Sequence, residues 1–246
     1  AVQKLGAEKF GMNPVGTGPF KFVEWWPAER IILERNEDYW GEKPFFKRVI
    51  WRFVREPLSR ILMLEKGECH VAEFVPPEEI ARLKAKGIKV QVEGTARSLF
   101  WNINRLNKEV PALADKRVRQ AMNYAVDKEA ICKSVLMGYT TPLRSTTTPY
   151  LRGVMPVKYY EYDPNKARQL LKEAGYPNGF KVTLAMTAGR YMKDVECAQA
   201  IQGYLKEVGI QVEIQQMEYG ALSALIRVPV EKDPKHQLHF WGFVAY

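Results

Sequence analysis

Cysteine and histidine, which serve many catalytic and metal sites, are scarce in this sequence. Its 246 residues include three of each. Cys69, Cys132 and Cys197 are odd in number, lie far apart and form no C-x-x-C motif, so the sequence predicts no disulfide framework and leaves the redox compartment open. No apolar run approaches the roughly 18 to 20 residues that a membrane-spanning helix needs. With 46% hydrophobic residues, the chain is globular and long enough for one large domain or two smaller ones.

Motifs for nucleophilic catalysis and for phosphate binding are also missing. No serine lies in a G-x-S-x-G elbow, and the histidines follow no serine in a triad pattern. Gly16-Thr-Gly18 resembles the start of a phosphate-binding loop, but Pro19 follows it and has no N–H group to offer. His236 and His239 would point to opposite faces of a strand, and their segment does not have a helical pattern. We therefore predict that the chain is not an enzyme and has no metal site and no cofactor.

Positive charge is in excess, with a formal net charge of +9. An excess of this size can serve nucleic acids or anionic surfaces, and a basic module of that kind is the alternative function. The densest basic run, residues 82–89, follows Glu78 and Glu79, so acids begin a predicted helix and bases end it, as the helix dipole favours. The other basic residues are scattered, and no zinc-finger, RNA-recognition or helix-turn-helix signature accompanies them. A solvated surface is the favoured interpretation, with no nucleic-acid partner.

Hydrophobic periodicity and turn residues predict a first half rich in strands and a second half of α/β type. In the first half, strands are predicted at residues 20–26, 30–35, 46–54, 69–74 and 88–92, and helices at 58–66 and 78–86. In the second half, a strand at 99–104 precedes helices that begin after Asp115, Asp127 and Asp163, each a good N-cap. Strand 181–186, a long helix and strand 211–217 then form a β-α-β unit.

Two aromatic clusters remain, and each has two interpretations. They are Phe100-Trp101 and the C-terminal group of Phe240-Trp241-Gly242-Phe243 with Tyr246. Core packing is the commoner fate of aromatic side chains. Aromatic residues beside glycine or at a strand end also suit the wall of a ligand cleft. The residues alone leave both interpretations open.

Four ordered stretches, which span nearly the whole chain, carry a family resemblance. They are NPVGTGPFKFVEWWPAERIILERNEDYWG, MLEKGECHVAEFVPPEEIARLK, FWNINRLNKEVPALADKRVRQAMNYAVDKEAI and YDPNKARQLLKEAGYPNGFKVTL. Together they resemble the extracellular solute-binding proteins of ABC transporters, in the dipeptide, oligopeptide and nickel-binding class known as family 5. The resemblance implies an α/β fold with the mixed-sheet lobes of the periplasmic-binding-protein-like class II fold. Such proteins are about twice as long, so the chain is expected to be an internal portion with an incomplete fold.

The resemblance implies a hinged, two-lobed receptor in the periplasm or outside the cell, which delivers its solute to an ABC permease in the membrane. Membrane association would come through the transporter or through a lipid anchor outside this chain. Residues 1–97 would belong to the first lobe, mostly sheet, and residues 98–246 to a second large α/β lobe truncated at its C-terminus. The cleft residues that the resemblance implies are Arg97, Phe100, Trp101, Asn102, Trp241, Gly242, Phe243 and Tyr246.

The ligand is expected to be a peptide or a related small amphiphilic solute, but one departure from the family pattern limits its identity. Peptide-binding members typically place an Asp after the G-W-like pair, where it takes the ligand's ammonium group, whereas residues 241–246 contain no acid. Burying an ammonium group without a counter-charge is costly. Either another acid takes this role or the ligand is an opine, a sugar, a nickel chelate or another solute used by relatives. Uncovered strand edges further predict self-association of the fragment.

Overall fold

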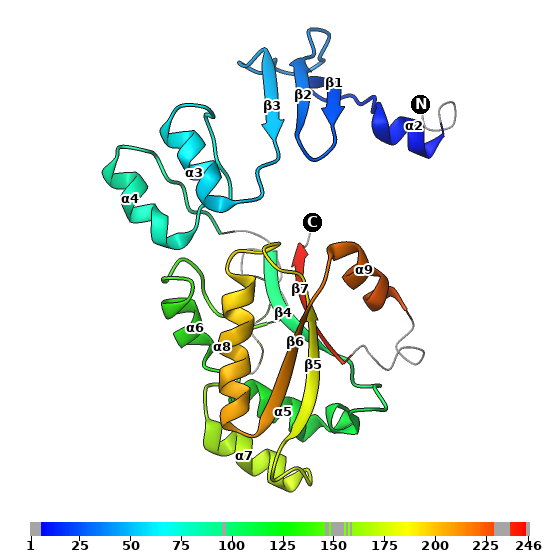
Figure 1. Cartoon of the computed structure of the whole chain (residues 1–246), viewed down its shortest axis with the longest axis vertical. Helices are drawn as coiled ribbons and strands as arrows, with labels where there is room; N and C mark the ends of the chain where they lie inside the picture. The colour runs from blue at the N-terminus through cyan, green and yellow to red at the C-terminus, as the bar shows by residue number, and fades with distance from the viewer. Residues whose placement is uncertain are drawn as a thin grey trace. The chain divides into compact units, whose positions relative to one another are not determined.

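The computed structural model describes residues 6–94, 97–145, 148, 155, 157, 159–228 and 237–244, and for residues 241–244 it describes the backbone only. The chain divides into two compact units, Ala1–Val75 and Pro76–Tyr246 (Figure 1). The division lies earlier in the chain than the boundary predicted after residue 97. On the C-terminal side of this division, an ion pair in which Lys193 Nζ lies 2.7 Å from Glu78 Oε1 joins the segment after Pro76 to the loop before α8. The assignment of residues 1–97 and 98–246 to two lobes stays a prediction.

The first unit is built on a small antiparallel sheet of strand order β1-β2-β3. Its elements are α2 (Ala7–Met12), β1 (Phe20–Trp26), β2 (Arg30–Arg35), β3 (Arg48–Arg52) and α3 (Pro57–Glu65). The strands predicted at 20–26 and 30–35 are confirmed, and the one predicted at 46–54 is shorter than expected. The tight turn between β1 and β2 holds Ala28 at a φ of 59°, in the left-handed region.

The strand predicted at 69–74 is wrong, because the segment does not pair with any described strand. Phe74 has a φ of 55°, which is incompatible with an extended chain. The guanidinium group of Arg60, in α3, donates hydrogen bonds to the carbonyl oxygens of Glu73 and Phe74 at 3.2 Å each. A side chain thus satisfies backbone groups that a neighbouring strand would otherwise have to satisfy. The strand predicted at 88–92 is wrong as well, since these residues follow the turn at Gly87 and pair with none of the described strands.

The second unit contains a four-stranded mixed sheet of order β4-β7-β5-β6. Strands β5 and β6 are parallel, β5 and β7 are parallel, and β4 and β7 are antiparallel. The predicted α/β class and the predicted β-α-β unit, here β5-α8-β6, are therefore confirmed. In Figure 1, α8 and α9 lie on opposite sides of these strands. The elements of this unit are η1 (Pro77–Glu79), α4 (Ile80–Ala85), β4 (Arg97–Ile103), η2 (Pro111–Ala114), α5 (Lys116–Tyr124), α6 (Lys128–Ser134), α7 (Pro164–Glu173), β5 (Phe180–Met186), α8 (Asp194–Glu207), β6 (Ile210–Gln216), α9 (Tyr219–Arg227) and β7 (Leu238–Val244).

Three aspartates begin helices of the second unit, as the sequence predicts. The carboxylates of Asp115, Asp127 and Asp163 accept hydrogen bonds from backbone N–H groups in the first turns of α5, α6 and α7, at 2.7 to 2.8 Å. Each bond satisfies a donor that the helix itself cannot satisfy, and such a cap contributes about 1 kcal/mol. These caps fix where the helices begin and so help to place them on the sheet.

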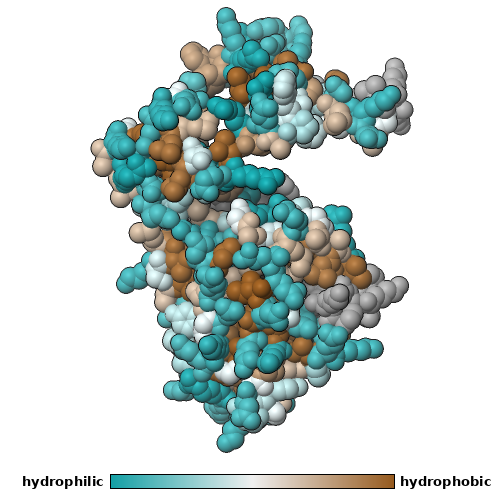
Figure 2. All heavy atoms as spheres, in the orientation of Figure 1, coloured by the Kyte–Doolittle hydropathy of each residue, from teal (hydrophilic) through white to brown (hydrophobic). Residues whose placement is uncertain are grey.

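Hydrophobic burial is concentrated in the second unit. Its core combines side chains of strands and helices, among them Leu113, Val118, Ala121, Leu171, Leu184, Met186, Ala198, Leu205, Ile210 and Leu238. Full burial of one large apolar side chain contributes about 1.5 to 3 kcal/mol. Among the described residues of the first unit, the buried hydrophobic side chains are Ile32 and Ile61, while Trp40 and Phe45 are 83% and 89% exposed. Figure 2 shows apolar residues at the surface of the molecule as well as polar ones.

Candidate ligand-binding edge of the second unit

Several strands of the second unit end or begin at one edge of the sheet. Strands β5, β6 and β7 run in the same direction, so their carboxyl ends lie at the same edge, and the antiparallel β4 begins there. The N–H group of Met217 donates to the carbonyl oxygen of Met186 at 2.9 Å and closes the ladder where β5 and β6 end. In open α/β sheets, ligands bind in the crevice outside the carboxyl ends of the strands. This edge is therefore the candidate site.

The paired strands β4 and β7 continue past the end of β5. Leu238 is opposite Leu184 of β5, so Phe240 is level with Met186, the last residue of β5. Residues 241–244 run beyond that level and pair with Phe100, Leu99, Ser98 and Arg97 in turn. The structure thus brings the backbones of the predicted cleft residues Trp241, Gly242 and Phe243 next to the start of β4. Tyr246 lies outside the described residues.

The predicted cleft residues of β4 are divided between the two faces of the strand. Trp101 packs against the hydrophobic core together with Leu99 and Ile103, and its Nε1 atom is buried without a hydrogen-bond partner among the described residues. Because alternate side chains of a strand point to opposite faces, Phe100 and Asn102 lie on the other face, where both are half-buried. Arg97, at the first position of β4, is exposed.

The loop between β5 and α8 presents a cationic side chain at this edge. The guanidinium carbon of Arg190 lies 3.7 Å from the centre of the Tyr219 ring and 5.7 Å from that of Tyr191. The Tyr191 ring in turn contacts the ring of Phe240 edge to face, at 6.2 Å between centroids. Residues of three neighbouring segments are therefore joined: the loop after β5, the start of α9 after β6, and β7. A cation over an aromatic face contributes about 0.5 to 2 kcal/mol.

Arg190 is exposed, and among the described residues no carboxylate lies within ion-pair distance of its guanidinium group. By contrast, Lys193 in the same loop is fully engaged: its Nζ atom lies 2.7 Å from Glu78 and 3.1 Å from Glu196. The hydrogen bond with Glu78, followed by Glu196, raises the pKa of Lys193, and Lys193 lowers the pKa of Glu78. One cation of the loop thus has a structural role, while the other keeps its hydrogen-bond donors available.

Sequence reasoning missed Arg190, Tyr191 and Tyr219. No local motif surrounds them, since Arg190 stands in an ordinary polar loop and Tyr219 begins a helix, α9, that the sequence pattern did not predict. The topology of the predicted unit nevertheless indicated where these residues would lie. The predicted β-α-β unit indicates that the segments after its two strands meet at the carboxyl edge, and that rule alone points to residues 187–193 and 217–219.

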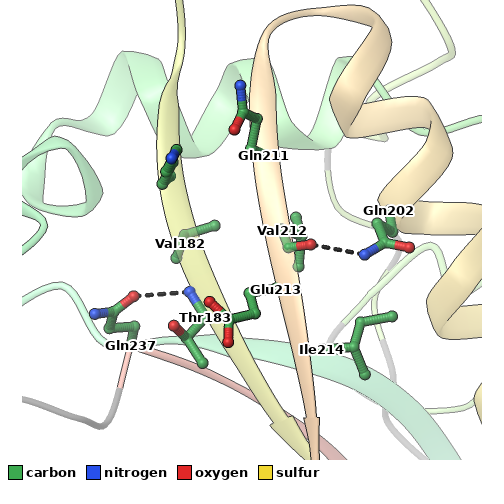
Figure 3. Close-up of a pocket in the computed structure, with 9 residues that line it drawn as sticks. Val182, Thr183, Gln202, Gln211, Val212, Glu213, Ile214 and Gln237 are labelled. Atoms are coloured by element: carbon green, nitrogen blue, oxygen red, sulfur yellow. Dashed lines mark hydrogen bonds between the residues drawn. The ribbon is translucent and has the colours of Figure 1, made fainter.

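A cavity lies elsewhere on the sheet, away from this edge. It has a volume of about 490 Å³ and is lined by β5, β6, α8 and the residue before β7 (Figure 3). Two of its amide side chains bond to backbone groups: Gln237 Oε1 accepts from the N–H group of Thr183, and Gln202 Nε2 donates to the carbonyl oxygen of Val212, both at 2.7 Å. Its β5 residues, Lys181 to Thr183, come from the first half of the strand, so the cavity is not part of the carboxyl edge.

The part of the chain that the structure describes gives little support for a reactive thiol, a metal site or a membrane-spanning helix. Burial raises the pKa of the Cys132 and Cys197 thiols to about 11, so both are protonated near neutral pH and are poor nucleophiles. No group of three or more His, Cys, Asp or Glu side chains within the described ranges is placed to hold a metal ion. None of the helices described combines the length and the apolarity that crossing a bilayer requires.

Comparison with known proteins adds an independent observation. Residues 1–245 match the family described as "Bacterial extracellular solute-binding proteins, family 5 Middle". The glutathione-binding protein GsiB of Escherichia coli O1:K1 / APEC is 32% identical over 247 residues, which cover 100% of this chain and 47% of that protein. The chain thus spans about half the length of the curated relatives it matches.

Solved structures resemble this chain over nearly all of its length. The periplasmic binding protein DppA of Helicobacter pylori, in complex with the peptide STSA, matches with a TM-score of 0.80 and 31% identity, over 99% of this chain and 46% of DppA. The dipeptide-binding protein of Pseudoalteromonas sp. SM9913, in complex with Met-Leu, matches with a TM-score of 0.81 and 25% identity, over 99% of this chain and 48% of that one.

Proposed function

Because the chain belongs to family 5 of the bacterial extracellular solute-binding proteins, we propose that it serves an ABC import system by binding a short peptide or a related small solute. The relatives named above bind glutathione, the peptide STSA and Met-Leu, and all three are binding proteins. Delivery of the bound solute to a membrane permease is part of this proposal, as is a location in the periplasm or outside the cell.

The observation that carries the proposal is the exposed guanidinium group of Arg190 at the carboxyl edge of the sheet. Tyr219 supports one face of this group at 3.7 Å, which leaves the N–H groups at its rim free to meet a ligand. A planar guanidinium group matches a carboxylate in shape and charge and binds it through two parallel hydrogen bonds. We therefore assign to Arg190 the binding of a carboxylate of the solute, such as the C-terminal carboxylate of a peptide.

The residues predicted from the sequence complete this site as further proposals. Phe100 and Asn102 are half-buried on the face of β4 that does not pack against the main core, which suits an apolar and a polar contact with a solute. The segment 241–243 pairs with the start of β4 and would contribute from β7. For Trp101 the contacts with the core favour a role in packing.

Binding of a solute at this edge needs no covalent reaction. The solute would exchange its hydration for the Arg190 guanidinium group and for aromatic surface, and hydrogen bonds to a charged group contribute about 1.5 to 3 kcal/mol. Removing the guanidinium group should therefore weaken the binding of a carboxylate by about 10- to 100-fold.

Calorimetry on the full-length protein tests the proposal. The solutes are glutathione, Ser-Thr-Ser-Ala and Met-Leu, with the C-terminal amide of each of the two peptides for comparison. We expect at least one acid to bind, its amide to bind more weakly, and Arg190→Gln to remove the difference. Arg168→Gln is the matched control, because Arg168 is exposed and contacts the carbonyl oxygen of Glu207, at the opposite end of α8 from the loop.

The alternative function, a basic module for nucleic acids or anionic surfaces, predicts a different result. Such a module would bind single-stranded RNA or duplex DNA at low salt, and its affinity would fall steeply as the salt concentration rises. Failure of all three solutes to bind, together with this salt dependence, would refute the solute-binding proposal.

A further inference from the structure

Asp194 is a buried carboxylate at the first position of α8, with only 2% of its surface exposed. Its two oxygen atoms accept four hydrogen bonds from backbone N–H groups. Oδ1 accepts from Gly189 at 3.0 Å and from Val195 at 2.9 Å, and Oδ2 accepts from Arg190 and Tyr191 at 3.0 Å each. Three of the four donors belong to the loop before the helix, so the carboxylate holds that loop more than it caps the helix.

The loop has the geometry of an anion-binding turn whose anion is part of the chain. Successive backbone N–H groups converge on one point when the residues alternate between right- and left-handed conformations. Gly189 has a φ of 72°, in the left-handed region, and the N–H groups of residues 189 to 191 all point to Asp194. The Asp194 carboxylate thus fills the position that a free anion would otherwise take. A solute carboxylate therefore has to be met by side chains of the loop rather than by these N–H groups.

Arg190 is held at both ends as a result. Its backbone N–H group is bonded to Asp194, and its guanidinium group is stacked on Tyr219. Tyr191, bonded to the same Asp194 oxygen, packs against Phe240 and ties the loop to β7. A side chain that is fixed before the solute arrives loses less conformational freedom on binding, so more of the interaction energy appears as affinity.

We infer that Asp194 is a positioning residue for solute binding, which acts through Arg190 and does not touch the solute. The inference rests on the proposed role of Arg190 as the partner of a solute carboxylate. Without the Asp194 carboxylate, four backbone donors lose their acceptor and the loop no longer presents Arg190 in one orientation. The affinity for a carboxylate should then fall toward that of a protein without the guanidinium group.

The first test uses the full-length protein without any solute. Hydrogen exchange is measured at the amide groups of residues 189–191 in the wild type, in Asp194→Ala and in Asp163→Ala. The matched control removes another helix-start aspartate of the same unit, whose carboxylate accepts from the N–H group of Lys166 at 2.8 Å. We expect exchange in the loop to become at least about tenfold faster in Asp194→Ala and to stay unchanged in Asp163→Ala. Unchanged exchange in Asp194→Ala would mean that the carboxylate does not hold the loop, and the inference would be wrong whatever binds.

The second test measures the affinity for Ser-Thr-Ser-Ala and for its C-terminal amide, and likewise for Met-Leu and its amide. We expect Asp194→Ala to weaken binding of the acid by about 10- to 100-fold, as Arg190→Gln does, and to leave binding of the amide unchanged. A merely structural defect would weaken acid and amide alike, so the split between them identifies positioning. Asp163→Ala should keep the preference of the wild type for the acid.

The outcomes distinguish a failure of the role proposed for Arg190 from a failure of the role inferred for Asp194. If the wild type prefers the acid, Arg190→Gln removes the preference and Asp194→Ala keeps it, then Arg190 binds the carboxylate and Asp194 is not its positioning residue. If the wild type binds acid and amide equally, Arg190 does not read the carboxylate, and the inference about Asp194 falls with it. Equal weakening of acid and amide by Asp194→Ala would also overturn the inference, because it would assign to Asp194 a general role in stability.

Discussion

Replacing Trp101 with Ala should destabilise the fold, because this side chain packs against the core of the second unit. Trp101 lies opposite Phe240, which is 4% exposed, and shares its face of β4 with Leu99 and Ile103. Truncating a fully buried aromatic residue to Ala costs about 3 to 5 kcal/mol. Two features reduce that figure here: the ring is half-buried, and its Nε1–H group is buried without an acceptor among the described residues.

The indole N–H group, which has no acceptor in the described part of the chain, allows a second substitution to be predicted. A buried donor without a partner costs about 1 to 3 kcal/mol, and both substitutions remove it. Trp101→Ala should therefore lower the free energy of unfolding by less than the fully buried figure, by about 1 to 3 kcal/mol. Trp101→Phe keeps most of the ring and loses the donor, so its stability should stay within about 1 kcal/mol of the wild type.

Urea unfolding followed by circular dichroism provides the measurement. Tryptophan fluorescence is unsuitable, because the chain has six tryptophans and the substitution would itself change the signal. A second probe must give the same midpoint before a two-state free energy is derived, since the chain divides into two units. A loss below about 1 kcal/mol in Trp101→Ala, or an equal loss in both variants, would refute the packing argument. Solute affinity measured on the same samples tests the cleft role that the sequence resemblance implies for Trp101.

Further predictions concern a close backbone approach and a buried thiol. Gly179→Ala should cost at least about 2 kcal/mol, because a Cβ atom there would clash with the carbonyl oxygen of Gly209 and Gly179 has a φ of 73°. Gly203→Ala, inside α8 with no atom within 4 Å of the added Cβ, is the control and should stabilise by about 0.5 to 1 kcal/mol in the same denaturation assay. Burial raises the pKa of Cys197 from 9.0 to about 11, so its contribution to stability is complete below pH 9, is lost at about 1.4 kcal/mol per pH unit between pH 9 and about 11, and changes no further above that. Cys197→Ala should make the alkaline loss of stability less steep than in the wild type, and an unchanged slope would show that this thiol does not titrate as its burial implies.

Elements with strong local signals were predictable from the sequence. The strands at 20–26 and 30–35 have the predicted bounds, because turn residues mark their ends. Asp115, Asp127 and Asp163 cap helices as predicted, since a short acceptor side chain just before a helical pattern is well placed to accept from the N–H groups of the first turn. The resemblance to family 5 is confirmed by the match over residues 1–245, and it rests on the order of many segments rather than on one motif.

Elements that depend on distant partners were not predictable. The segment 69–74 has strand-like composition, yet the Arg60 side chain bonds to its last carbonyl groups and Phe74 turns the chain. Helix α9 begins without a side-chain cap and has Gly220 in its first turn, so neither propensity nor capping marks it. The unit boundary at residue 75 reflects tertiary contacts such as the one between Glu78 and Lys193, which are far apart in the sequence.

The candidate site divides along the same line between local and distant information. Topology alone could locate it, because a β-α-β unit brings the segments after its strands to one edge. In the proposed site, the side chain of the loop that faces a solute depends on an internal contact that the sequence pattern does not indicate. An aspartate at a helix start normally caps its own helix, whereas Asp194 accepts from three residues before it. The backbone N–H groups of the loop are therefore bonded to the chain's own carboxylate. The Arg190 guanidinium group is then the cationic donor that the loop has available for a solute, because Lys193 is paired with Glu78 and Glu196.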